Sequence, residues 1–200
     1  MRLTLPMLNI LSILLLVAGC VAPAKKKDDA TANVAKMKLA SHAQSLKTFA
    51  EEQKGNMKYG ILIDMSIPSW KKRFFVVDLE TDSVLVAGMC THGQGDDYQR
   101  EEVVFSNVPN SLCTSEGRYK VGVSYNGKFG LAYKLHGLDK TNDKAYERAV
   151  VLHAHSCVSN IEGDPVCRSW GCPTVSPEVL KATAKLLDGS KQPVLMWIYK

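Results

Sequence analysis

The chain has 200 residues, 46% hydrophobic and 22% charged, which is enough for one ordinary globular domain once a leader is set aside. Its net charge of +5 is spread among interleaved lysines and acids, so nucleic acid is not expected as a partner. The sequence contains neither an internal repeat nor a glycine-rich phosphate loop, and we expect no cofactor.

Residues 1–19 have the pattern of a signal peptide. Arg2 gives a positive start, and the apolar core from Leu8 to Val17 is shorter than the roughly 20 residues that span a bilayer. Val17-Ala18-Gly19-Cys20 resembles the lipobox of exported bacterial lipoproteins, which are cut before the cysteine that carries the lipid. The alternative is an ordinary signal peptide in which Cys20 is incidental.

Lipidation at Cys20 would attach the chain durably to a membrane, because the lipid carries two acyl chains. A single acyl chain gives only marginal membrane binding. The following residue is Val21 rather than Asp, which in the sorting pattern of such lipoproteins implies the outer membrane. We therefore expect a lipid-anchored protein of the cell envelope, on the periplasmic face of the outer membrane.

The rest of the chain is expected to form a tether, a helix and one domain. Residues 20–30 are small, charged and proline-bearing, which is typical of a tether. Residues 31–55 carry apolar side chains at three- and four-residue steps, which predicts a helix that stops at Gly55. Residues 56–200 are expected to form the domain, with a second helix over Pro177–Leu187.

Short apolar and β-branched runs within 56–200 predict strands. The dipeptide Asn126-Gly127 predicts a hairpin, because both residues readily adopt the positive φ of a type I′ turn. The expected fold class is thus mostly β (α+β), with helices at the two ends. The predicted strands are Tyr59–Ile63, Arg73–Leu79, Ser83–Gly88, Glu102–Phe105, Tyr119–Tyr125, Phe129–Leu135, Arg148–His153 and Val194–Tyr199.

Six cysteines are present, and an exported protein can oxidise those that have no other role. Setting aside Cys20 and Cys172 leaves four cysteines, which permit three pairings. We favour Cys157–Cys167, which would brace the segment before Cys172, with Cys90–Cys113 as its complement. Four buried, reduced thiols are the alternative.

The chemistry is expected to centre on Cys172 and His153. An apolar run ends at His153, and Cys172 follows Gly171, which allows a sharp turn and a close approach of substrate. A thiol attacks carbonyl carbon as its thiolate, so it needs a base or a positive field. The pair therefore indicates a thiol nucleophile with its proton acceptor.

Several segments in fixed order resemble the L,D-transpeptidase (YkuD-like) family, in the branch of murein L,D-transpeptidase catalytic domains. The family has a histidine and then, some eighteen or more residues later, Ser-x-Gly-Cys. The resemblance covers about Tyr59 to Tyr199 and implies a β-sandwich or barrel catalytic domain. Its motifs are Ser106-Asn107-Val108-Pro109-Asn110-Ser111, Gly117-Arg118-Tyr119, Tyr125-Asn126-Gly127-Lys128, Leu135-His136-Gly137-Leu138 and Arg168-Ser169-Trp170-Gly171-Cys172-Pro173.

The resemblance implies a role for each matching position. Cys172 would be the nucleophile and His153 its general base, oriented by the backbone carbonyl of Ala154. The N–H groups of Trp170, Gly171 and Cys172 would bind the oxyanion. The residues that would shape the turn or contact substrate are Ser169, Arg168, His136, Tyr125 and His155.

The implied substrate is the peptidoglycan stem peptide. Cys172 would release a terminal D-alanine and form a thioester, which an amine of a second stem or of a protein lysine would then accept. Discharge to water would make the enzyme an L,D-carboxypeptidase. A third hypothesis is a catalytically inactive lipoprotein that binds stem peptides.

Two further observations qualify this interpretation. Trp170, the run Pro173-Thr174-Val175 and the run His153-Ala154-His155 depart from the commoner family pattern, which leaves the acceptor open. A zinc site from His153, His155, Cys157 and Cys167 is also conceivable from ligand type, but the sequence has no Cys-x-x-Cys or His-x-x-x-His pair, and we expect no metal.

Overall fold

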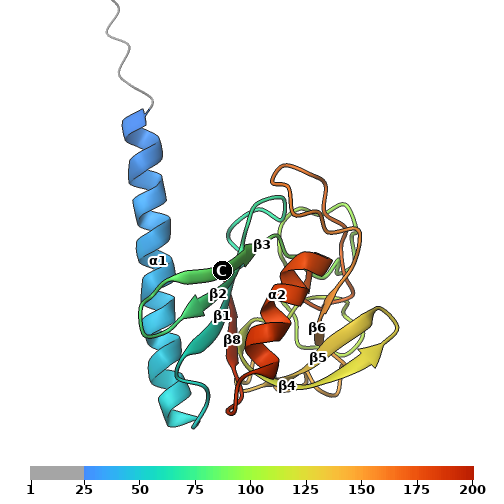
Figure 1. Ribbon diagram of the computed structural model, residues 1–200. Helices are drawn as coiled ribbons and strands as arrows, with labels where there is room; N and C mark the ends of the chain where they lie inside the picture. Colours follow the sequence, from blue (N-terminus) through green and yellow to red (C-terminus); the bar gives the residue numbers. More distant parts are fainter. Residues whose placement is uncertain (1–24) are drawn as a thin grey trace, which may run out of the picture. The chain divides into compact units, whose positions relative to one another are not determined.

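The computed structural model describes residues 25–200 (Figure 1). The chain divides into two units, Met1–Ala35 and Lys36–Lys200, and all strands belong to the second. The predicted signal peptide and Cys20 lie outside the described residues. Within the described part, no helix combines the length and the hydropathy needed to cross a membrane.

Helix α1 covers Lys25–Glu52, so it begins inside the segment predicted as a tether and ends slightly before the predicted end at residue 55. The sequence between Pro23 and Gly55 contains neither glycine nor proline, which leaves nothing to interrupt a helix there. At the C-terminal end, the N–H of Gly55 donates to the carbonyl of Ala50 at 2.8 Å. This bond closes the last turn and directs the chain into the first strand.

Eight strands form one sheet in the order β3-β2-β1-β8-β4-β5-β6-β7. The pairs β1–β8 and β6–β7 are parallel, and all others are antiparallel. The mostly β fold with two helices is therefore confirmed. The strands are β1 Tyr59–Asp64, β2 Phe74–Asp78, β3 Val84–Gly88, β4 Gly117–Gly127, β5 Gly130–Gly137, β6 Val151–Ala154, β7 Thr174–Val175 and β8 Leu195–Tyr199, with helix α2 at Pro177–Asp188.

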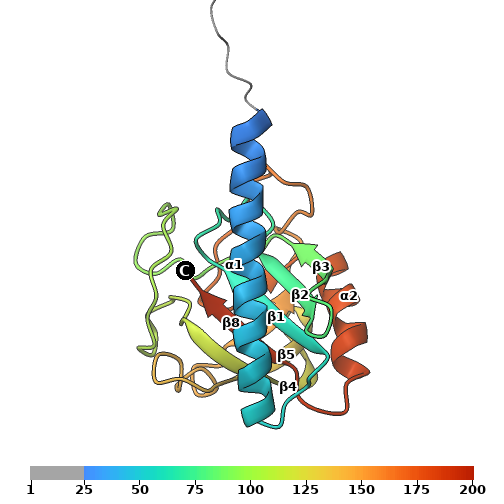
Figure 2. The same ribbon diagram turned by 90° about the vertical axis from the view of Figure 1, so that its left-hand side faces the viewer.

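The two faces of the sheet each carry a hydrophobic core. Figure 2 shows the part of helix α1 after residue 35 running across strands β1 and β8. On one face Leu46 of α1 packs with Leu62 of β1, and both are fully buried. On the other face Leu180 of α2 joins a larger core that contains Ile61 and Ile63. The side chains of successive β1 residues thus point to opposite faces of the sheet, as strand geometry requires. Each such buried side chain contributes about 1.5–3 kcal/mol.

Two predicted strands differ from those observed. The segment Glu102–Phe105 makes only an isolated bridge from Phe105 to Thr114, and Glu102 pairs with Lys200 at 3.0 Å. Strand β6 begins at Val151 rather than at Arg148. The reason is Ala149, whose φ of 55° is incompatible with an extended strand.

The β4–β5 hairpin is present, but its turn lies two residues beyond the predicted one. Gly127 pairs with Gly130, so the turn residues are Lys128 and Phe129 rather than Asn126 and Gly127. Gly130, with φ of 81°, supplies the left-handed conformation that returns the chain. The shift matters because it places Phe129 at the tip.

Candidate active site

A pocket of about 460 Å³ lies beside the ends of β6 and β7. Its volume is in the range of small-ligand sites. The tip of the β4–β5 hairpin forms one wall, and the loop before β7 forms another. The pocket is lined by Lys128, Phe129, His153, His155, Cys157, Cys167, Arg168, Ser169, Trp170, Cys172 and Thr174. It therefore contains both residues of the predicted nucleophile–base pair.

His153 is only 7% exposed and is fixed on both sides of its ring. Nδ1 donates to the carbonyl of Ala154 at 3.0 Å, and because a carbonyl only accepts, the neutral ring has its lone pair on Nε2. The ring of Phe129 stacks on the imidazole at 5.1 Å. Burial lowers the pKa of His153, the Ala154 carbonyl partly opposes that effect, and the nearby His155 adds to it. The imidazole is thus neutral at pH 7 and able to accept a proton.

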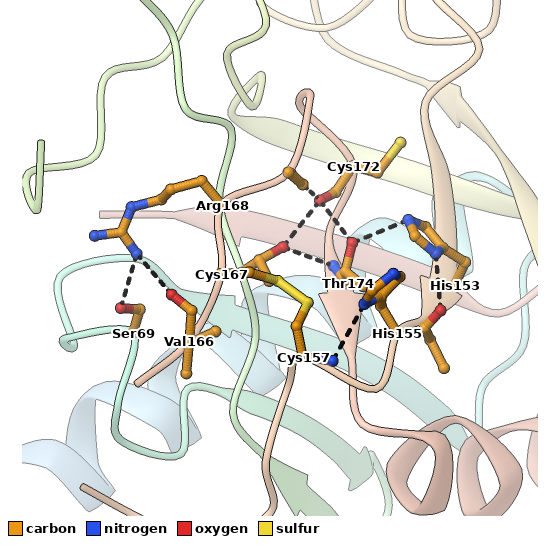
Figure 3. The surroundings of a disulfide bond; sticks show 12 residues. Ser69, His153, His155, Cys157, Val166, Cys167, Arg168, Cys172 and Thr174 are labelled. Carbon is orange, nitrogen blue, oxygen red and sulfur yellow. Dashed lines mark hydrogen bonds between the residues drawn. A yellow bond between two sulfur atoms is a disulfide. The ribbon is translucent and has the colours of Figure 1, made fainter. Parts of the chain in front are cut away.

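Thr174 holds the nitrogen that would accept this proton. Its hydroxyl lies 3.0 Å from Nε2 of His153, and it has a second acceptor, the carbonyl of Cys172, at 3.4 Å (Figure 3). The parallel register of β6 and β7 pairs His153 directly with Thr174, which explains the contact. No sequence motif predicted a role for Thr174.

Cys172 is partly buried in the loop just before β7. Its thiol has one hydrogen-bond partner in the described part of the chain, the carbonyl of Ala149 at 4.0 Å. Burial raises the pKa of the Cys172 thiol, whereas the N–H of Val151 and the cation of Arg148 lower it. The resting pair at pH 7 is therefore a neutral thiol and a neutral imidazole in one pocket, and His153 Nε2 is bonded to Thr174 rather than to sulfur.

The turn that carries the nucleophile is braced from within by Ser169. Its hydroxyl donates to the carbonyl of Cys172 at 2.7 Å and accepts from the N–H of Gly171 at 3.2 Å. The predicted oxyanion role of the Gly171 N–H is thus not supported, because that group already has a partner. Among residues 25–200, the N–H groups of Trp170 and Cys172 have none.

Gly171 is required by the turn for two reasons. Its φ is 113°, which only glycine adopts readily, and a Cβ there would lie 2.7 Å from the carbonyl oxygen of Cys113. The turn therefore packs closely against the loop that contains Cys113.

A model of a known protein family covers most of the chain. The model of the L,D-transpeptidase catalytic domain (YkuD_2) matches residues 29–199. The chain belongs to this L,D-transpeptidase family. No curated protein matches it.

Two similar solved structures are both of the helical cell shape determining protein Pgp2 from Campylobacter jejuni. A lysine-to-alanine variant of Pgp2 is 11% identical, with a TM-score of 0.49, over 71% of this chain and 47% of that one. A second Pgp2 structure is also 11% identical, with a TM-score of 0.46, over 77% of this chain and 55% of that one. The chain thus spans about half the length of the Pgp2 chains.

In this member of the L,D-transpeptidase family, Arg168 is already engaged. Its side chain is 4% exposed, and it pairs with Glu101 at 2.8 Å and bonds to the Ser69 hydroxyl at 3.3 Å. Of the two roles predicted for it, shaping the turn agrees with these contacts, whereas binding a substrate carboxylate would require its partner to be displaced. Trp170, by contrast, is 75% exposed and free to meet a ligand.

The disulfide Cys157–Cys167 is present and lines the pocket (Figure 3). The N–H of Cys157 donates to Nδ1 of His155 at 3.1 Å, which holds that ring beside the bridge. The ligand atoms of His155, Cys157 and Cys167 lie within 4.8 Å of one another, but a disulfide offers no thiolate to a metal.

The predicted Cys90–Cys113 disulfide is absent, and both residues are buried free thiols. Cys90 belongs to the core beneath α2, and its thiol donates to the carbonyl of Thr91 at 3.4 Å. Cys113 instead lies in the loop against Gly95 and Gly171. Counting cysteines could not distinguish a core thiol from a loop thiol.

His136 and Tyr125 do not line the pocket of Cys172. His136 stacks on Tyr146 at 4.7 Å and lines a separate groove of about 700 Å³ with Lys120 and Lys134. The ammonium of Lys134 lies over the ring of Tyr125, 5.4 Å from its centroid. The structure therefore gives neither residue a contact with the nucleophile.

Proposed function

We propose that this protein is a cysteine L,D-transpeptidase that acts on peptidoglycan stem peptides through a thioester on Cys172. The observation that carries the proposal is that Cys172 and a neutral, oriented His153 share one open pocket, within an L,D-transpeptidase catalytic domain. The stem peptide as substrate follows from the family.

Acylation begins when the Thr174 hydroxyl turns from Nε2 of His153 to its second acceptor, the Cys172 carbonyl. His153 then accepts the thiol proton, and the thiolate attacks the carbonyl carbon before the terminal D-alanine. The unpartnered N–H groups of Trp170 and Cys172 receive the oxyanion, each contributing about 3–4 kcal/mol. The C–N bond breaks, and His153 returns its proton to the departing D-alanine amine.

Deacylation transfers the acyl group to an acceptor. An amine of a second stem, or of a protein lysine, attacks the thioester carbon and gives a proton to His153. The C–S bond then breaks, and His153 returns the proton to the departing Cys172 sulfur. Water in the same position would make the outcome L,D-carboxypeptidase activity. Cys172 is only partly buried and lines an open pocket, so water is the competing acceptor that the experiment must distinguish from an amine.

The test is digestion of purified peptidoglycan, followed by mass spectrometry of the muropeptides. The proposal expects new cross-linked products when an amine acceptor is present, and shortened stems if water is the acceptor. Cys172→Ser should produce neither. Stem binding that survives Cys172→Ala, without any product from the wild type, would instead support an idle binding lipoprotein.

The envelope location is part of the same proposal and rests on the lipobox-like run before Cys20. We expect labelling by palmitate in the full-length protein and its loss in Cys20→Ala. Labelling that persists in Cys20→Ala would remove the lipid anchor from the proposal, without bearing on the chemistry at Cys172.

A further inference from the structure

We propose that the guanidinium of Arg148 is the cation that stabilises the Cys172 thiolate, so that the thiolate does not depend on a hydrogen bond to His153. The inference rests on the proposed function of Cys172 as a nucleophile. It concerns a residue that no motif singled out.

Arg148 is fixed by neutral groups only. Its Nη1 donates to the carbonyl of Ser106 at 2.9 Å, and its Nη2 donates to the carbonyl of Cys113 at 2.7 Å. No carboxylate pairs with Arg148 among residues 25–200. Its positive charge is therefore held in place without being neutralised, and in a partly buried site such a charge acts over a longer range than in water.

The charge lies next to the residue that precedes the nucleophile. A Cβ built on Gly171 would be 3.4 Å from Nη2 of Arg148. Burial raises the pKa of Tyr119 to about 12. The charge of Arg148 opposes this rise, and Cys172 adds to it.

The backbone after Arg148 adds to this arrangement. Ala149 has φ of 55°, a left-handed conformation that costs a non-glycine residue about 1–2 kcal/mol. This conformation directs its carbonyl to the thiol at 4.0 Å. Val151 follows, and its N–H favours the thiolate. The strained turn therefore stands between Arg148 and Val151, the two groups that lower the pKa of the Cys172 thiol.

His153 does not supply this stabilisation in the structure, because its Nε2 is bonded to Thr174. The pKa of the Cys172 thiol is lowered by Val151 and Arg148 and raised by burial, with no contribution from His153. The other titratable or charged groups of the pocket and its rim are His153, His155, Lys128 and Arg168, the last paired with Glu101.

The experiment measures alkylation of Cys172 by iodoacetamide between about pH 7 and about pH 12, because burial raises the pKa of this thiol above its ordinary value. The Cys172 peptide is followed by mass spectrometry in the full chain, which separates it from buried Cys90 and Cys113. The variants are Arg148→Gln, Arg148→Lys and His153→Gln. Lys128→Gln is the matched control, because Lys128 is another cation that lines the pocket.

Arg148→Gln should raise the apparent pKa of Cys172 by about one unit, which makes alkylation at neutral pH about tenfold slower. Arg148→Lys, His153→Gln and Lys128→Gln should keep the wild-type value. An unchanged pKa in Arg148→Gln, or an equal rise in His153→Gln, would overturn the proposal. If Arg148→Gln does not fold, Arg148→Lys and His153→Gln decide, because the proposal requires both to retain the wild-type pKa.

This experiment is independent of turnover. If the pKa results fail while peptidoglycan is still processed, only the role of Arg148 is lost. If Arg148 shifts the pKa but no stem product or acyl-enzyme forms, the electrostatic assignment stands and the proposed function fails.

Discussion

Replacing Thr174 by valine tests how the His153 ring is held. The hydroxyl is lost at nearly constant volume, and Nε2 of His153 loses its hydrogen bond inside a site where Thr174 is 2% and His153 7% exposed. The Cys172 carbonyl keeps two other donors, Ser169 at 2.7 Å and Thr91 at 3.3 Å. The cost is therefore that of one unsatisfied buried nitrogen, about 1–3 kcal/mol.

The assay for Thr174→Val is thermal or urea unfolding combined with the rate of acylation by a stem tetrapeptide. For a chain of this size, each 1 kcal/mol lowers Tm by about 2–4 °C. Because Ala154 and Phe129 still hold the ring, acylation should fall by less than about tenfold, against about a hundredfold or more in His153→Gln.

Thr183→Val is the matched control for this prediction. Its hydroxyl is also buried, but it bonds to the Val179 carbonyl within α2, away from the pocket, so its removal should leave acylation unchanged. Thr174→Ser should behave like the wild type. Wild-type stability in Thr174→Val would refute the reasoning, and a loss of acylation as large as in His153→Gln would make Thr174 a proton carrier rather than a positioning residue.

Three other predictions follow from the structure. Replacing both Cys157 and Cys167 by serine opens a bridge between residues 10 apart and should lower the free energy of unfolding by about 3 kcal/mol in urea titrations; a change below about 0.5 kcal/mol would contradict this. Gly171→Ala should abolish acylation by the stem tetrapeptide, because the added Cβ would clash with the Cys113 carbonyl and the φ of 113° disfavours alanine; normal acylation of the folded variant would show that the turn adapts. Burial and the cation of Arg73 lower the pKa of His92 from 6.5 to about 3, so the stability that neutral His92 contributes is complete above pH 6.5 and is lost as the pH falls toward about 3. Between these two pH values, His92 contributes about 1.4 kcal/mol per pH unit to the slope of the free energy of unfolding against pH. His92→Gln should therefore flatten this slope in unfolding experiments. An unchanged slope would exclude His92 as its source.

The sequence was informative where chemistry is local. The sequence singled out His153 and Cys172 because few residue types can act as base and nucleophile, and both side chains line one pocket. The alternation of apolar residues predicted most strands and both helices, and the mostly β fold is confirmed. The spacing of Cys157 and Cys167 suited a short bridge, and the structure contains it.

The residues that were missed depend on contacts between distant segments. Thr174 meets His153 only through the parallel register of β6 and β7. Arg148 is placed by carbonyls 42 and 35 residues earlier in the chain, Ser106 and Cys113, which no local pattern encodes. The hairpin turn moved to Lys128 and Phe129 because Gly130, rather than Asn126-Gly127, takes the positive φ. Long-range placement therefore decided what local propensity could not.

The measurement that tests the account most directly is the intact mass of the protein, quenched during reaction with a stem tetrapeptide. The account predicts an adduct equal to the stem without its terminal D-alanine, located on the peptide that contains Cys172 and absent from Cys172→Ser. Turnover of the tetrapeptide by Cys172→Ser, or an adduct on any other residue, would contradict it.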